Sequence, residues 1–195
     1  MRIVVLFVLF LNGSAVAVAE ESSHVPVHQN VLVLIDNSGS LRLGLISLFQ
    51  IKQSLRDAAE ILQPYQSVYV ATWSKQLSQP QVWEFSDTES VIRSIKPNGT
   101  TNIGTTLESV YRLHNIQCAS VVFIIHQDPD DKQLFRQMVQ ELSRTRPVSA
   151  LLVGYSDLEW YRRASTHPNY TVARLRTKSL VAAVERSVPG SGCRF

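Results

Sequence analysis

Two uninterrupted apolar runs constrain the fold of this chain more than any other feature. Residues 31–35 read VLVLI, and residues 120–125 read SVVFII. Runs of this length, rich in β-branched residues, are typical of strands that are buried on both faces. Such strands occur in parallel sheets, because the crossover helices of a parallel sheet cover both of its faces. The two runs therefore predict a parallel sheet with helices between its strands.

The segments around these runs supply the remaining elements. Further strands are expected at residues 67–73, 81–85, 148–153 and 170–175, and helices at 45–63, 103–113 and 180–188. Residues 81–85 alternate apolar with polar side chains, which favours a strand at the edge of the sheet. The fold class predicted is α/β: a doubly wound, mostly parallel six-stranded sheet with one antiparallel edge strand and helices on both faces, Rossmann-like.

Three short polar motifs indicate where other helices begin. The sequences SDTE at 86–89 and SDLE at 156–159 have the spacing of capping boxes, with Ser86 and Ser156 as the capping residues. Asp130 and Asp131 can cap a further helix. The apolar face of that helix is expected to consist of Leu134, Phe135, Met138, Val139 and Leu142.

The N-terminus is typical of an export signal. Arg2 precedes the apolar run IVVLFVLFL, and small residues follow at Ala17 and Ala19. This pattern predicts a signal peptide at residues 1–19, cleaved after Ala19, although an uncleaved anchor is the alternative. Residues 20–30 form a polar lead-in, 31–188 the folded domain and 189–195 a C-terminal tail. We expect a secreted or periplasmic protein with no integral membrane segment in the mature chain.

Export makes the two cysteines a candidate pair, because disulfides persist in oxidising compartments. Cys118 precedes a predicted strand, and Cys193 follows the last predicted helix. Both positions are expected at the end of the sheet opposite the loops discussed below, so a Cys118–Cys193 disulfide is predicted; two free thiols are the alternative. The formal net charge is +3, with scattered Lys and Arg, so nucleic-acid binding is not supported.

Oxygen-bearing side chains follow three of the predicted strands or helices. In doubly wound folds, ligands bind beyond the carboxyl ends of the strands, and three loops meet there. These loops carry Asp36, Ser38 and Ser40, then Thr100 and Thr101, then Gln127 and Asp128. Donors of this kind suit Mg²⁺, Mn²⁺ or Ca²⁺ rather than zinc or copper. The alternative for the first loop is a plain strand-to-helix turn, for which Asp and Ser are also favoured.

The motifs D-N-S-G-S at 36–40 and T-N-I-G at 101–104 resemble those of von Willebrand factor type A (VWA) domains, and the resemblance extends over about residues 31–188. It implies a metal-ion-dependent adhesion site, in which the two serines and Thr101 coordinate a divalent cation and the aspartates act mostly through water. It also implies a non-enzymatic protein-binding module for adhesion or assembly. An acidic residue of a partner protein would supply the last ligand.

The third motif departs from the family pattern. The family usually ends this strand in an aspartate, and a gapless match places Gln127 there, with Asp128 one residue later. The ligand set expected from the resemblance is therefore Asp36, Ser38, Ser40, Thr101 and Asp128, with Mg²⁺ as the first choice of metal. A VWA scaffold with a degraded site that binds partners without metal is the alternative.

Two enzymatic or nucleotide-binding interpretations fit the sequence less well. Gly99 and Gly104 have the spacing of a phosphate-binding loop, but Thr105 stands where such a loop needs lysine. A serine hydrolase would use Ser38 or Ser40 with His126 as base, but the chain lacks a Gly-x-Ser-x-Gly elbow and an evident group to orient the histidine. Trp73 and Trp83 are expected in the core rather than in a ligand site.

Overall fold

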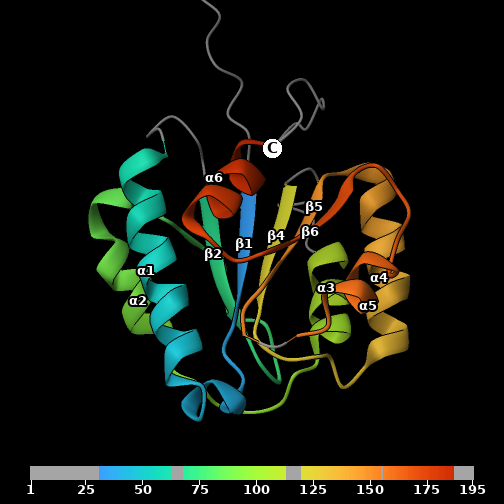
Figure 1. The fold of residues 1–195 in the computed structure, drawn as a ribbon, viewed down its shortest axis with the longest axis horizontal. Coiled ribbons are helices and arrows are strands. Elements are labelled where there is room, and N and C mark those ends of the chain that lie inside the picture. The colour runs from blue at the N-terminus through green and yellow to red at the C-terminus, as the bar shows by residue number, and fades with distance from the viewer. Residues whose placement is uncertain (1–30, 63–67, 113–119, 155, 187–195) are drawn as a thin grey trace, which may run out of the picture.

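The computed structural model describes residues 31–62, 68–112, 120–154 and 156–186 (Figure 1). Its centre is a six-stranded sheet with the strand order β3-β2-β1-β4-β5-β6. The strands are β1 (Val31–Asp36), β2 (Val68–Trp73), β3 (Gln81–Val82), β4 (Ser120–Ile125), β5 (Val148–Leu152) and β6 (Tyr170–Arg174). Only β3 runs antiparallel to its neighbour, β2, and the other pairings are parallel.

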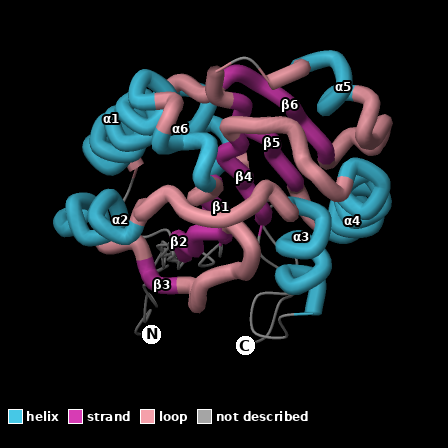
Figure 2. The backbone as a smooth tube through the Cα atoms, turned by 90° about the horizontal axis from the view of Figure 1, so that it is seen from below, coloured by secondary structure: helices cyan, strands magenta, loops and turns pink. Residues whose placement is uncertain are grey.

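Helices cover both faces of this sheet. They are α1 (Leu45–Ile61), α2 (Thr88–Ser94), α3 (Ile103–Arg112), α4 (Lys132–Thr145), α5 (Leu158–Arg162) and α6 (Thr177–Glu185), with short 3₁₀ turns η1 (Gly39–Arg42) and η2 (Phe85–Asp87). Helices α1, α2 and α6 lie on one face, and α3, α4 and α5 lie on the other (Figures 1 and 2). This arrangement confirms the predicted fold class, including the antiparallel edge strand.

The sheet separates two hydrophobic clusters, and β1 contributes to both. Val31, Val33 and Ile35 pack beneath α1 and α6, whereas Leu32 and Leu34 pack beneath α3 and α4. Side chains of a strand alternate between the two faces of the sheet, so a strand covered on both faces is apolar along its length. The polar residues of these two strands, Asp36 of β1 and Ser120 of β4, stand at the strand ends. All residues of β1 and β4 are buried, which explains the uninterrupted runs in the sequence.

Strand β3 is shorter than predicted. Its strand pairing covers Gln81 and Val82, and Trp83 N–H adds one backbone hydrogen bond to Val68 O at 2.7 Å. The chain then leaves the sheet instead of continuing to Phe85. The reason is that Trp83 turns into the core, where it is 2% exposed and its indole Nε1–H donates to Thr88 Oγ1 over 3.0 Å. Trp73 is fully buried, so both tryptophans pack in the core as predicted.

The predictions that Ser86 and Ser156 cap helices are wrong, because in each case the next residue is the cap. Asp87 caps α2 by accepting from Ser90 N–H, and Asp157 caps α5 by accepting from Glu159 and Trp160 N–H. Ser156 does not cap, because its hydroxyl donates to His126 O over 2.9 Å.

Two further helix boundaries differ from the prediction. Helix α6 begins at Thr177 rather than Leu180, since the Ser179 hydroxyl accepts from Arg176 N–H at 2.8 Å and closes the first turn. At α4, Asp131 occupies the N-cap position, but its side chain makes no capping hydrogen bond to that helix.

Several predictions fall on residues outside the described ranges. These are the signal peptide at 1–19, the lead-in at 20–30, the tail at 189–195, and the pairing of Cys118 with Cys193. Among the helices of the described ranges, none has both the length and the apolar character needed to cross a membrane.

Candidate functional site

The first two predicted loops meet at the carboxyl end of β1, which Figure 2 views from below. The chain between α2 and α3 crosses this end of the sheet on its way from one face to the other. Asn98 N–H donates to Asn37 O over 2.7 Å, and Gly39 N–H donates to Gly99 O over 3.0 Å. Gly99 has a φ of 84°, a conformation that side-chain-bearing residues rarely adopt. Two backbone hydrogen bonds therefore hold the second loop against the first.

Asp36 joins the first loop to the third. Its carboxylate is fully buried; Oδ1 accepts from Ser38 N–H at 2.8 Å, and Oδ2 accepts from His126 N–H at 3.0 Å. Burial raises the pKa of the Asp36 carboxyl above its ordinary value, and the hydrogen bonds from Ser38 and His126 partly oppose that shift. Asp36 thus fixes the geometry of both loops while keeping a buried carboxylate at the strand end.

The serine hydroxyls lie together beside this carboxylate. Ser38 Oγ and Ser40 Oγ are 2.9 Å apart, and Ser38 is 1% exposed. In the second loop, Thr101 is 2% exposed whereas Thr100 is exposed, so Thr101 is the inward-facing residue of that pair. The structure therefore brings Ser38 and Ser40 into direct contact and places Thr101 in the adjoining, hydrogen-bonded loop.

The second and third loops are tied by a reciprocal pair of hydrogen bonds. Thr101 N–H donates to Asp130 Oδ2 over 3.2 Å, and Asp130 N–H donates to Thr101 O over 3.1 Å. Asp131 adds a second link, because its carboxylate accepts from Gly104 N–H at 3.0 Å and from Thr105 N–H at 2.8 Å. Sequence reasoning assigned these two aspartates to the cap of α4 and so missed their role in positioning the loop of Thr101.

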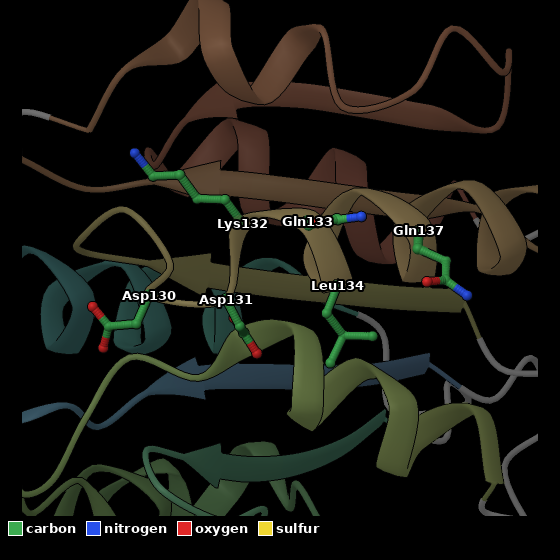
Figure 3. Close-up of a pocket in the computed structure, with 6 residues that line it drawn as sticks. All are labelled: Asp130, Asp131, Lys132, Gln133, Leu134 and Gln137. Atoms are coloured by element: carbon green, nitrogen blue, oxygen red, sulfur yellow. The ribbon is translucent and has the colours of Figure 1, made fainter.

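Figure 3 shows the side chains of Asp131 and Leu134 directed toward the neighbouring helix, α3. Beside them lies a hollow of about 540 Å³, whose lining also includes Asp130, Lys132, Gln133 and Gln137. The hollow opens at the start of α4. The signal in the sequence that marks this region is the run D-P-D-D at 128–131, in which three carboxylates follow a buried strand.

Gln127, the residue aligned with the family's aspartate, contributes through its backbone. Its side chain is exposed, and its carbonyl oxygen accepts from the Tyr161 hydroxyl at 3.1 Å. Asp128 is half-buried, and its Oδ1 atom is buried without a hydrogen-bond partner in the described structure. Burial raises the pKa of Tyr161, and the charges of Asp128 and Asp36 raise it further.

His126 lies against the serine pair. Its Nδ1 is 3.3 Å from Ser40 Oγ, and within the described ranges this is the only hydrogen bond of its imidazole. The other edge of the ring faces Gly44, where an added Cβ would lie 2.8 Å from Nε2. Gly44 therefore makes room for the imidazole beside Ser40.

The donors fit a hard divalent cation better than a soft one. No group of three or more His, Cys, Asp or Glu in the described ranges could hold a metal ion, so any cation here depends on hydroxyls. The paired serine oxygens, the buried Asp36 carboxylate and the unpartnered Asp128 Oδ1 are all oxygen donors, which Mg²⁺, Mn²⁺ and Ca²⁺ prefer. A buried acceptor without a donor is unfavourable, and a cation would offset that cost.

Comparisons with known proteins identify the fold. No protein-family model matches the sequence, and no curated protein is significantly similar to it. Solved structures do match it: a von Willebrand factor type A protein from Catenulispora acidiphila has a TM-score of 0.61 at 15% identity, over 80% of this chain and 41% of that one. This chain thus corresponds to less than half of that protein.

Two other similar structures contain metal. Manganese-loaded Plasmodium vivax TRAP protein has a TM-score of 0.58 at 17% identity, over 80% of this chain and 72% of that one. Proximal thread matrix protein 1 from the mussel byssus, with a zinc-occupied metal-ion-dependent adhesion site (MIDAS) motif, has a TM-score of 0.55 at 13% identity, over 82% of this chain and 46% of that one. The chain therefore has the VWA fold that its motifs predict.

Proposed function

We propose that this chain is an exported VWA-type protein-binding module that recognises an acidic group of a partner through a divalent cation. Ser38, Ser40 and Thr101 would hold the cation, with Asp36 and Asp128 behind them. The bound cation would offer an open coordination position to the partner's carboxylate.

The observation that carries the proposal is the contact between the Ser38 and Ser40 hydroxyls, 2.9 Å apart beside a buried carboxylate. Asp36 is held by two backbone N–H groups, so the serine pair is preorganised rather than dependent on the cation for its position. The manganese and zinc named for the two similar structures support a divalent cation in this fold. Mg²⁺ remains our first choice, because few carboxylates and several hydroxyls suit a site that retains water.

We propose a binding role rather than an enzymatic one, although Ser40 and His126 lie within hydrogen-bond distance. A serine nucleophile needs a base that a third group orients. Here the Nε2 edge of His126 faces Gly44 and Gly154, so no orienting carboxylate contacts it in the described structure. Labelling of Ser38 or Ser40 by a fluorophosphonate probe would contradict the binding role.

The test is the melting temperature with and without Mg²⁺, in the wild type and in Asp36→Ala. A ligand at about 100 times its Kd stabilises the folded state by about 2.7 kcal/mol, which raises the melting temperature of a domain of this size by roughly 5–10 °C. Asp36→Ala should lose this increase. Asp157→Ala is the matched control: it removes the cap of α5 at the same end of the sheet and should keep the Mg²⁺ response. A wild type that responds to none of Mg²⁺, Mn²⁺ and Ca²⁺ would refute the proposal.

A second candidate is a VWA scaffold that binds partners without metal. It is favoured by the position of Gln127 and by the engagement of both Asp36 oxygens with backbone N–H groups, which holds the loops without a cation. In that case chelation with EDTA would leave both stability and partner binding unchanged.

A further inference from the structure

An exposed apolar patch lies directly after the serine loop. It consists of Leu43, Leu45, Ile46 and Phe49, and we call it the α1 patch. The exposed fractions of these side chains are 94%, 71%, 84% and 65%. Single exposed apolar residues are common, but a contiguous group on a soluble domain usually marks an interaction surface. Leu45 and Ile46 are each within one helical turn of Phe49, so the side chains are neighbours.

The core does not use these side chains, because they lie on the side of α1 that faces away from it, whereas Leu48 packs against the core. Ser47 also faces inward, with 7% of its surface exposed. Further along the helix, Ile51, Leu55 and Ala58 face the core in the ordinary way. The exposed side chains of Leu45, Ile46 and Phe49 are therefore free to contact something outside the described fold.

The α1 patch is continuous with the proposed cation site. Leu43 N–H and Gly44 N–H both donate to Ser40 O, at 3.1 Å and 3.2 Å. Gly44 also packs against the His126 ring that contacts Ser40. The patch extends about 6 Å along α1 from Leu45 to Phe49, as four residues of helix do. One docked segment could therefore cover both the serine loop and the patch.

The charge around the patch selects the kind of partner. From Asn37 to Arg56 the sequence contains no Asp or Glu, and its charged residues are Arg42, Lys52 and Arg56. Arg56 is paired with Glu89 of α2 at 2.6 Å, so Arg42 and Lys52 supply the positive charge near the patch. A bound divalent cation would add to this positive character. A second copy of the chain that docked through the same patch would place like charges together. An acidic and apolar segment of another protein is the complementary occupant.

We propose that the α1 patch docks a partner segment in which apolar side chains flank the acidic residue that reaches the cation. This inference rests on the proposed function, which supplies the cation. The acidic residue would determine binding at the serine loop, and the flanking apolar side chains would add affinity and select among acidic partners.

The experiment selects phage-displayed random peptides of about ten residues, which span roughly 33 Å when extended, on the full chain in Mg²⁺. The selected peptides are then titrated by fluorescence anisotropy against the wild type, Ile46→Ser/Phe49→Ser and Ile61→Ser. Ile61 is the matched control, because it is 48% exposed at the far end of the same helix. All three side chains are exposed, so these variants should fold; their melting temperatures with and without Mg²⁺ are measured as well.

We expect selected peptides to share an Asp or Glu with large apolar residues nearby. Their affinity should fall about tenfold or more in Ile46→Ser/Phe49→Ser, stay unchanged in Ile61→Ser, and be lost with EDTA or when the peptide's acid becomes its amide. Equal affinity for the double variant would overturn the inference, as would peptides without an acid or no selection at all.

Two outcomes would assign the patch to a different occupant and also overturn the inference. They are concentration-dependent dimerisation on size exclusion, and binding to phosphatidylglycerol vesicles, when either is abolished by Ile46→Ser/Phe49→Ser. Failure of the inference differs from failure of the proposed function. In the first case Mg²⁺ still raises the melting temperature, and in the second it does not.

Discussion

Replacing Asp131 by alanine tests how the loop of Thr101 is held. Asp131 lies at the start of α4, but its carboxylate accepts from Gly104 N–H, Thr105 N–H and the Thr105 hydroxyl, at 3.0, 2.8 and 3.1 Å. These amides belong to the first turn of α3, where no intrahelical acceptor is available to them. Asp131 thus caps the first turn of a preceding helix, through amides that lie 27 and 26 residues earlier in the chain.

The expected loss in the free energy of unfolding is about 2 kcal/mol. Removing a capping side chain costs about 0.5–2 kcal/mol, and hydrogen bonds to a charged group contribute about 1.5–3 kcal/mol. Because Asp131 is partly exposed and its contacts are not additive, we take the middle of these ranges. For a chain of this size the melting temperature should fall by roughly 4–8 °C. Urea denaturation measures the first quantity, and thermal denaturation by circular dichroism measures the second.

Amide hydrogen exchange locates the effect. If Asp131 caps α3, Asp131→Ala should lower protection at Gly104 and Thr105 while leaving Phe135 protected, because Phe135 N–H bonds to the backbone oxygen of residue 131. Thr105→Val is the control, since it removes only the hydroxyl bond and should cost less. A change in unfolding free energy below about 0.5 kcal/mol, the range typical of plain surface substitutions, would refute the reasoning. Loss of protection confined to α4 would do the same.

Two further predictions concern packing and pH. Gly104→Ala should lower the free energy of unfolding by about 1–3 kcal/mol, measured by urea denaturation. The added Cβ would lie 2.6 Å from Phe135 N and 2.9 Å from Leu134 C, which are both backbone atoms of α4. The control Ser109→Ala, on the same helix as Gly104, should change the free energy of unfolding by less than about 0.5 kcal/mol. Burial raises the pKa of Tyr170 above its ordinary value, so the stability it contributes is complete below about pH 10 and is lost as the pH rises above that, where tyrosine ionises in the unfolded chain. Tyr170→Phe should flatten this alkaline decline in denaturation curves measured between about pH 8 and 11, and an unchanged slope would contradict the assignment.

The central strands could be predicted because burial on both faces leaves an unambiguous pattern. Every residue of β1 and β4 is enclosed, so no polar residue interrupts the run until the strand ends. The edge of the sheet could not be predicted as well. Residues 81–85 alternate in the manner of a half-buried strand. In the structure, however, the indole of Trp83 is buried and donates to Thr88, and the chain leaves the sheet at this point. Tertiary packing there overrides the local pattern.

The same distinction applies to the candidate site. Asp36, Ser38 and Ser40 lie within five residues, so a short turn suffices to bring them together, and the motif is visible in the sequence. The links to the third loop join residues far apart in the chain: Asp130 binds Thr101, and Asp131 binds Thr105. An aspartate before a helix is read locally as its cap. The three-dimensional structure is needed to show that these carboxylates bind the loop of Thr101 and the start of α3 instead.

The displaced carboxylate of the third loop bears on whether the site can hold a cation. Within a strand, a shift of one residue would send a side chain to the opposite face of the sheet. Strand β4 ends at Ile125, however, so residues 126–128 belong to a loop in which that alternation no longer applies. The Gln127 backbone is held by Tyr161, its side chain is exposed, and the adjacent Asp128 has the buried, unpartnered oxygen. We infer that moving the acid from 127 to 128 does not by itself remove the second carboxylate from the site. Asp36 and Asp128 would then both be available to a divalent cation, which the metal-dependent proposal requires and the metal-free scaffold does not.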